Sequence, residues 1–321
     1  MPETKDDRIK ALEFGHPEYI PARVGLLPAS WMRHREKIED IVARHPIIFG
    51  PYKKGSRNFD EVGGYYAKGR HVDPWGCVWE NINPGCDAYV KEHPVPTREG
   101  VRKLKAPQER TGMPHGFMYM RLFYLRGFEE LMVDFAEEPP ELQMLIDIVL
   151  EHNMKELELT LKEGVPPLMH FGDDLGMQTS LAMGPAKWRK HLKPCFAKIF
   201  GRCRQAGAYT YLHTDGHCHE IIPDLIDCGL NVVNPQIRAN GLDNLARVCK
   251  GKICVDLDLD RQMFPFCGPK EIDAHVREAV EALGSPEGGL WLTAECGPDV
   301  PLVNVEAICQ ALEKYRAHFR Q

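Results

Sequence analysis

The chain has 321 residues, which is enough for one barrel-sized domain or for two smaller ones. Its net charge of -6, without basic runs, argues against nucleic acid as the main partner. Its 11 cysteines are an odd number spread over a long chain, unlike the disulfide framework of a small secreted domain, so most are expected to be reduced and buried.

Membrane and export signals are not evident in the sequence. No run of about 18 apolar residues occurs, and the first residues, MPETKDDRIK, have neither the basic start nor the apolar core of a signal peptide. We therefore expect a soluble, cytoplasmic protein that does not act at a membrane.

The N-terminal part begins with a predicted helix at 7–14 and a predicted strand at 20–26. Residues 46–95 differ in composition, because Gly, Pro, aromatic and charged residues alternate there without a helical period. We predict a long excursion with hairpins that covers the mouth of the functional site, since loops of this length inside a compact chain usually do so. The alternative is a surface extension or a subunit contact, such as that of a homodimer.

From Arg98 onward, predicted strands and helices alternate regularly. The strands end at glycine or polar residues and lie near 119–124, 168–171, 209–212, 230–233, 253–257 and 290–294. The main helices are predicted at 140–163, 185–205, 221–226 and 269–283, and from 243 and 304 onward. This alternation implies parallel strands joined by right-handed crossovers.

These elements make about seven or eight strand–helix units, which favours a (β/α)8 TIM barrel. We predict a single α/β domain over residues 1–321, with the N-terminal excursion as an elaboration of the barrel. A doubly wound open sheet is the alternative fold.

The segment 208–236 is the most informative part of the chain. A short strand stops at the polar loop HTDGHCH, and an apolar helical stripe follows that ends at Cys228-Gly229, where Gly is usual just past a helix. Five side chains of this loop are able to bind a metal or move a proton. A solvated turn is the alternative, but such residues concentrate where parallel strands end.

Ionisable or polar side chains follow most of the predicted strands. In chain order they are Asp173, Asp174, His213, Asp215, Asn234, Asp256, Asp258, Glu295 and Cys296. In a closed parallel barrel these positions share one rim, where barrel enzymes keep their active sites, so we expect an enzyme. Taken alone, each residue is more often a helix cap, and Asp173 and Asp174 are candidates for that role.

Metal binding is the sharper interpretation of this rim. His213 and Asp215 leave the same face of an extended backbone because they are two residues apart, and Cys296 arrives from the last strand. Neutral imidazole and thiolate are good Zn2+ ligands, and three protein ligands leave an open position for chemistry. We predict that these three residues bind zinc. Four residues are alternatives to any member of this set: His217, Cys218, His219 and Glu295.

Several strings resemble the uroporphyrinogen decarboxylase-like superfamily. They are FGDDLGMQTSLAMGPAKWRKHLKP, HTDG, IIPDLIDCGLNVVNPQ and CGPDVPLVNVEAI, with IPARVG and DPWGCVW similar to its N-terminal part. The resemblance implies a (β/α)8 barrel and an enzyme. Superfamily members include the decarboxylase itself and corrinoid-dependent methyltransferases. The decarboxylase's Arg-rich signature RQAGR, which would bind substrate carboxylates, is absent after Ile20, which argues against porphyrinogen decarboxylation.

The methyltransferase branch typically uses His-x-Cys and a distant Cys as zinc ligands. By this resemblance His213 matches the His, Asp215 replaces the first Cys, and Cys296 matches the distant Cys. Because a carboxylate is a harder ligand than a thiolate, a Lewis acid acting on a methyl ether oxygen is favoured. The resemblance implies transfer of a methyl group from a small donor, such as an aryl methyl ether, to a cobalamin (corrinoid) cofactor on a partner corrinoid protein. A decarboxylase or lyase acting on a small carboxylic acid is the alternative.

The remaining predictions concern the reaction centre. Asp173 and Asp174 are the predicted catalytic residues, which hold the substrate or donate a proton to the leaving oxygen. The predicted substrate contacts are Trp75, Tyr119, Tyr124, Asn234 and Asp256. For the three aromatic residues, core packing is the more common alternative. The acidic rim predicts a neutral or weakly charged substrate, since carboxylates repel a multiply charged anion.

Overall fold

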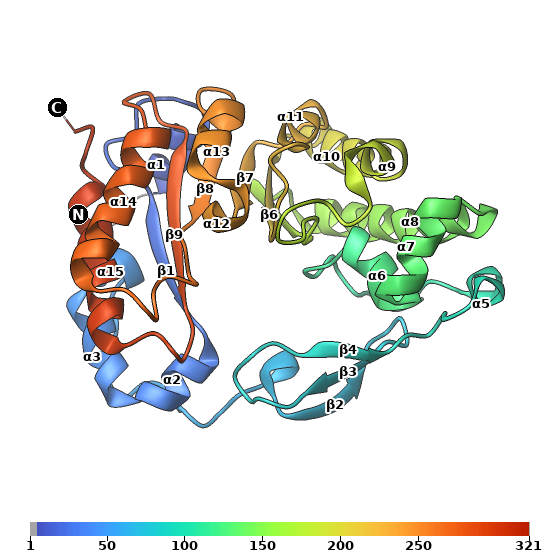
Figure 1. The fold of residues 1–321 in the computed structure, drawn as a ribbon, viewed down its shortest axis with the longest axis horizontal. Coiled ribbons are helices and arrows are strands. Elements are labelled where there is room, and N and C mark those ends of the chain that lie inside the picture. The colour runs from blue at the N-terminus through green and yellow to red at the C-terminus, as the bar shows by residue number, and fades with distance from the viewer. Residues whose placement is uncertain (1–4, 321) are drawn as a thin grey trace. The chain divides into compact units, whose positions relative to one another are not determined.

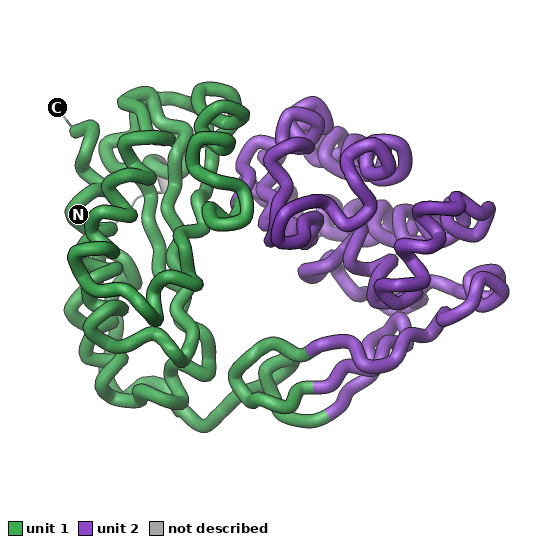
Figure 2. The backbone as a smooth tube through the Cα atoms, in the orientation of Figure 1, with its two compact units in different colours: residues 1–69, 81–88, 235–321 green, residues 70–80, 89–234 purple. Residues whose placement is uncertain are grey.

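Six strands in a parallel strand–helix arrangement and a separate three-stranded antiparallel sheet form the β-structure of the computed structural model, which describes residues 5–320. The chain divides into two compact units (Figure 2). Unit 1 holds the described residues up to 69, residues 81–88 and those from 235 onward, and unit 2 holds residues 70–80 and 89–234. The expectation of a single domain stays a prediction.

Unit 1 is built around three strands in the order β1-β9-β8. Its strands are β1 (Ala22–Leu26), β8 (Cys254–Asp258) and β9 (Leu290–Cys296). Its helices are α1 (Lys5–Leu12), α2 (Pro28–His34), α3 (Glu36–Arg44), α4 (Pro46–Phe49), the 3-10 turn η1 (Gly64–Tyr66), α12 (Ile237–Asn240), α13 (Leu242–Cys249), α14 (Pro269–Leu283) and α15 (Leu302–Tyr315). The strand pairs are parallel, and every residue of β8 is buried, as expected for strands covered on both faces.

Unit 2 contains the strand order β7-β6-β5 and the small antiparallel sheet. Its strands are β2 (Gly69–Val72), β3 (Val78–Asn81), β4 (Tyr89–Glu92), β5 (Leu168–Gly172), β6 (Tyr209–Thr214) and β7 (Val232–Pro235), of which β2, β3 and β7 each have one end residue in unit 1. Its helices are α5 (Arg98–Lys103), α6 (Tyr119–Arg126), α7 (Phe128–Glu137), α8 (Pro140–Glu163), α9 (Gly184–His191), α10 (Lys193–Gln205) and α11 (Ile222–Asp227) (Figure 1).

The register between β5 and β6 sets the position of the functional residues. The two strands are parallel, and Gly172 at the end of β5 is paired with His213 of β6. Their carboxyl ends therefore lie at the same edge, and the loops that follow, which begin at Asp173 and Asp215, start side by side. This is the rim arrangement expected from the sequence, here within unit 2.

Most of the predicted elements are confirmed, but fewer parallel strands are present than expected. The described residues contain six strands of the barrel type instead of seven or eight units, so an α/β fold related to the barrel is confirmed and the (β/α)8 count is not. The hairpins predicted within 46–95 are present as β2, β3 and β4, with β3 antiparallel to β4. Their role as a cover stays a prediction.

The strand predicted at 119–124 is wrong, because these residues form helix α6. Its aromatic residues favour a strand locally, whereas tertiary contacts decide for the helix. The carboxylate of Asp173 accepts hydrogen bonds from the backbone N–H groups of Tyr119 and Met120 in the first turn, so a residue far along the chain caps this helix.

The helix predicted at 185–205 is also divided, into α9 and α10. Pro194 lies in the first turn of α10 and has no N–H with which to continue the preceding helix, so a second helix starts there. None of the helices between residues 5 and 320 combines the length and the apolar character that a membrane span requires.

Candidate metal centre at the ends of strands β5 and β6

Two glycines allow the loops after β5 and β6 to lie in direct backbone contact. A Cβ atom on Gly216, which has φ +80, would come within 2.3 Å of the backbone of Gly176, and a Cβ on Gly176 would lie 2.3 Å from the backbone nitrogen of His217. The N–H of Gly176 donates to the carbonyl of Asp215 at 3.1 Å, and that of His217 donates to Met177 at 2.7 Å. The loops thus hold each other as a short, tightly packed pair.

Replacing Gly216 with alanine is therefore expected to damage this loop pair. A left-handed φ costs a non-glycine residue about 1–2 kcal/mol, and the contact with Gly176 adds to that. Gly251→Ala is the matched control, because Gly251 has φ +71 but nothing within 4 Å of its added Cβ. Urea unfolding should show a clearly larger loss of unfolding free energy for Gly216→Ala than for Gly251→Ala. Equal losses would mean that the two loops separate without cost.

Three side chains of unit 2 meet where these loops begin. His115, Asp174 and His213 each present a ligand atom, and these atoms all lie within 4.8 Å of one another. His115 Nε2 lies 3.0 Å from Asp174 Oδ2, and His213 Nε2 lies 3.7 Å from Asp174 Oδ1. Two imidazoles and one carboxylate are the donor set of catalytic zinc sites and of non-haem iron sites. The geometry therefore suits a divalent transition metal without selecting zinc.

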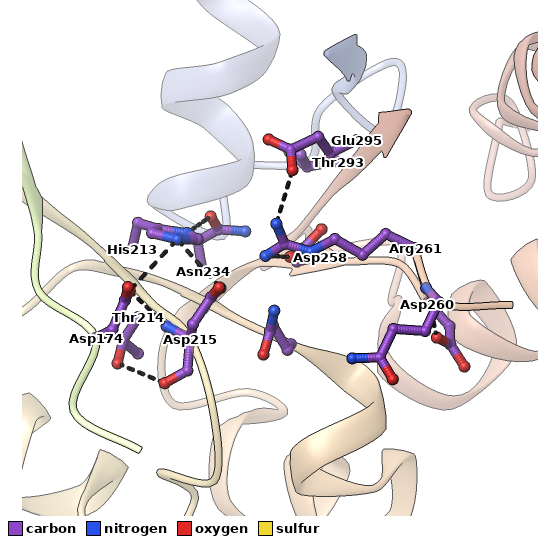
Figure 3. Close-up of polar contacts among 12 residues, drawn as sticks. Asp174, His213, Thr214, Asp215, Asn234, Asp258, Asp260, Arg261, Thr293 and Glu295 are labelled. Carbon is purple, nitrogen blue, oxygen red and sulfur yellow. Dashed lines mark hydrogen bonds and ion pairs between the residues drawn. The ribbon is translucent and has the colours of Figure 1, made fainter. Parts of the chain in front are cut away.

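Asn234 and Asp215 complete the surroundings of His213 (Figure 3). Asn234 Oδ1 lies 2.7 Å from Nδ1 of His213, and Asp215 Oδ1 lies 3.2 Å from its Nε2. With Nδ1–H donated to the amide oxygen, Nε2 is left as the ligand atom, which is how ligating histidines are usually oriented. Asp174 Oδ1 also accepts the backbone N–H of Asp215 at 3.0 Å. The residues present therefore fit a bound metal.

The charges of this cluster are strongly coupled. Burial alone would lower the pKa of His213, but the hydrogen bond and charge of Asp215 and the charge of Asp174 raise it to about 9. Burial alone would raise the pKa of Asp174, but the hydrogen bond and charge of His115 and the charge of His213 hold it below its usual value. Since metal ligands must be deprotonated, a bound divalent cation would displace the imidazole protons.

Asp173, the other predicted catalytic carboxylate, lies in a different environment. It is fully buried, and its oxygens accept the N–H groups of Tyr119 at 2.6 Å and Met120 at 2.9 Å. Burial raises its pKa to about 7, although these two hydrogen bonds oppose the shift. These contacts correspond to the helix-cap alternative, and a catalytic role for Asp173 stays a prediction.

Cys296 and Asp256 belong to unit 1 and have partners or surroundings of their own. Cys296 is fully buried at the end of β9, and burial raises the pKa of its thiol to about 12, which disfavours the thiolate form that binds zinc. Asp256 accepts a hydrogen bond from Thr293 Oγ1 at 2.6 Å and lies 3.3 Å from Arg23. Their assignment to the metal and to the substrate stays a prediction.

A pocket of about 630 Å³ lies in unit 1 at the ends of β8 and β9. Arg261 lines it and donates to Glu295 at 2.7 Å and to Asp258 at 2.8 Å (Figure 3). Arg238 also lines it and is paired with Asp260 at 2.8 Å. Both guanidinium groups are thus matched by carboxylates of the chain, and the pocket has the size of a small-molecule site.

The three predicted aromatic contacts are buried within unit 2. The guanidinium of Arg121 lies over the rings of Trp75 and Tyr124, and it donates to the buried carboxylate of Asp73 at 2.7 Å. Tyr119 is buried in the first turn of α6. These contacts correspond to the core-packing alternative, and substrate contact by these residues stays a prediction.

The sequence did not single out His115. It lies in the irregular segment between α5 and α6, within the string GMPHG, and it does not follow a strand. It is therefore absent from the set of residues that follow the predicted strands. A lone histidine between Pro114 and Gly116 carries little signal until the fold places it beside Asp174.

Residues 117–315 match the sequence model of the family described as Uroporphyrinogen decarboxylase (URO-D). The search of curated proteins found no match. Among solved structures, the chain is similar to Xanthomonas albilineans dihydropteroate synthase with 4-aminobenzoic acid, at 17% identity and a TM-score of 0.31. That alignment covers 45% of this chain and only 52% of the synthase, so it indicates neither fold nor function. Because the URO-D model spans more than half of the chain, the protein belongs to the uroporphyrinogen decarboxylase family.

Proposed function

We propose that this protein is a corrinoid-dependent methyltransferase that moves a methyl group from a small donor, such as an aryl methyl ether, to cobalamin on a partner corrinoid protein. Membership of the uroporphyrinogen decarboxylase family indicates an enzyme, and the methyl transfer is our assignment. The observation that carries it is the cluster of His115, Asp174 and His213. A divalent metal bound there would act as a Lewis acid towards the departing oxygen of the donor.

The chain's own residues prepare this site. Asp174 is shared by the two imidazoles, one on each of its oxygens, and so keeps His115 and His213 facing the same point. Asn234 sets the orientation of the His213 ring through Nδ1. Asp215 is the carboxylate next to the cluster, where it completes the ligand set or exchanges a proton with the departing oxygen.

Three arginines of unit 1 are paired within that unit. They face carboxylates of the same unit: Arg23 with Asp256, Arg238 with Asp260, and Arg261 with Asp258 and Glu295. Binding a multiply carboxylated porphyrinogen would require a surplus of positive charge. The carboxylates of Asp174 and Asp215 at the cluster, together with the missing RQAGR string, favour a neutral or weakly charged donor.

Methyl transfer to reduced cobalamin should be visible as a change in the cobalamin absorption spectrum. We expect at least one donor in a panel of aryl methyl ethers, methanol and methylamines to give this change with the metal-loaded protein. His213→Ala should slow it by at least the about 10²–10⁴-fold typical of a lost catalytic group. Asp227→Asn, a change at an exposed carboxylate, is the control.

Two outcomes would change this assignment. If no donor alkylates cobalamin while a small carboxylic acid releases carbon dioxide, the protein is a decarboxylase. If methyl transfer proceeds equally well in wild type and His213→Ala, the reaction is supported but the cluster is not its site.

A further inference from the structure

The segment that carries His115 is held at both ends by one turn of helix α8. At its start, the N–H groups of Thr111 and Gly112 both donate to Oε2 of Glu156, at 3.3 and 2.8 Å. At its end, the carbonyl of Phe117 accepts a hydrogen bond from Asn153 Nδ2 at 2.8 Å. His115 lies between these two attachments, although it has no direct contact of this kind with α8.

The α8 residues that make these contacts are deeply buried. Glu156 is 0% exposed, and His152 and Asn153 are 4% and 3% exposed. His152 Nε2 lies 2.7 Å from Oγ1 of Thr111, which adds a third attachment. A buried carboxylate costs several kcal/mol unless it is hydrogen-bonded. Packing of α8 alone therefore does not explain why these buried positions are polar.

The strand on the other side of the segment is shaped to receive the imidazole. The N–H of Gly116 donates to the carbonyl of Gly172 at 2.7 Å. A Cβ atom on Gly172 would come within 2.4 Å of Nδ1 of His115, so only glycine leaves room for the ring. His115 thus lies between the loop held by α8 and the end of β5, with Nε2 directed at Asp174.

We propose that Glu156, assisted by His152 and Asn153, is a positioning residue that holds His115 in reach of Asp174 and thereby raises the metal affinity of the site. The inference rests on the metal site of the proposed function, but it concerns residues that touch no ligand of that metal except through the loop. Outer partners of metal ligands are commonly worth about 10–100-fold in affinity.

The two side-chain oxygens of Glu156 allow a matched pair of variants. Both backbone bonds go to Oε2, and Oε1 has no hydrogen-bond partner among the described residues. Glu156→Gln therefore keeps both bonds through its amide oxygen, whereas Glu156→Ala removes them. Glu163→Ala is the local control, because Glu163 makes an exposed ion pair with Arg110, next to the same segment.

Zn2+ affinity, measured by competition with a chromophoric chelator, should fall by about 10–100-fold in Glu156→Ala. It should stay close to wild type in Glu156→Gln and Glu163→Ala. Hydrogen exchange of the amides at 112–117 is measured alongside, and only Glu156→Ala should lose protection there. Gly172→Ala, which leaves the α8 contacts in place but displaces the imidazole, should also lose affinity.

Unchanged Zn2+ affinity in a folded Glu156→Ala variant overturns the proposal, as does an equal loss in Glu156→Gln. If Glu156→Ala does not fold, Asn153→Ala, which frees the other end of the segment, decides in the same way. If the wild type binds no Zn2+, the metal assignment of the proposed function fails, and the exchange data alone decide whether Glu156 positions the loop.

Discussion

His115→Ala and His213→Ala should each reduce bound metal from about one ion per chain to a level that elemental analysis does not detect. Each variant removes one of the three donors within 4.8 Å of one another, and two remaining donors hold a divalent ion far less tightly than three. The loss of metal affinity should exceed about 10–100-fold, which is the contribution of residues that only support the ligands. Because both imidazoles reach solvent, with side chains 45% and 28% exposed, the unfolding free energy should change little.

Two further variants identify the ligand set. His217→Ala removes a histidine from the same loop that does not belong to the cluster, and it should keep its metal. Cys296→Ser tests the ligand predicted from the sequence. Metal loss in Cys296→Ser together with full retention in His115→Ala would establish the sequence-derived set of His213, Asp215 and Cys296 and would contradict the cluster.

The part of the site that was predictable from the sequence is the part that depends on strand register. Asp174 and His213 each lie within three residues of the end of a short β-forming run, and parallel strands bring such positions to one edge. The pairing of Gly172 with His213 confirms that reasoning for β5 and β6. Asn234 was expected at the same rim for the same reason, and it contacts the His213 ring.

The part that was not predictable depends on long-range contacts. His115 reaches Asp174 because α8 holds its loop, and nothing local in the string GMPHG indicates those contacts. The sequence predicts a strand where helix α6 lies. The helix could not be predicted because the cap that favours its first turn comes from Asp173, more than 50 residues later in the chain. Local propensity and strand-end patterns contain neither kind of information.

Asp173→Ala and Asp174→Ala should have opposite consequences, although the two residues are adjacent and were both predicted to be catalytic. Asp173→Ala leaves two N–H groups without their acceptor, that of buried Tyr119 and that of half-buried Met120. Losses of this kind cost about 1–3 kcal/mol each, so urea unfolding should show a loss of about 2–6 kcal/mol in unfolding free energy. Asp173→Asn keeps one oxygen that accepts a backbone N–H, so its unfolding free energy should lie between those of wild type and Asp173→Ala.

Asp174→Ala should instead abolish metal binding and slow turnover by about 10²-fold or more, at a smaller cost in unfolding free energy. Its partners His115 and His213 reach solvent, with side chains 45% and 28% exposed, so water replaces part of what the carboxylate provided. Metal content and urea midpoints of both alanine variants therefore form a two-by-two test. A stable Asp173→Ala protein without metal would contradict the capping role of Asp173 and would support its role in the reaction centre. A severely destabilised Asp174→Ala protein would show that the main role of the cluster is to stabilise the fold and not to bind a metal.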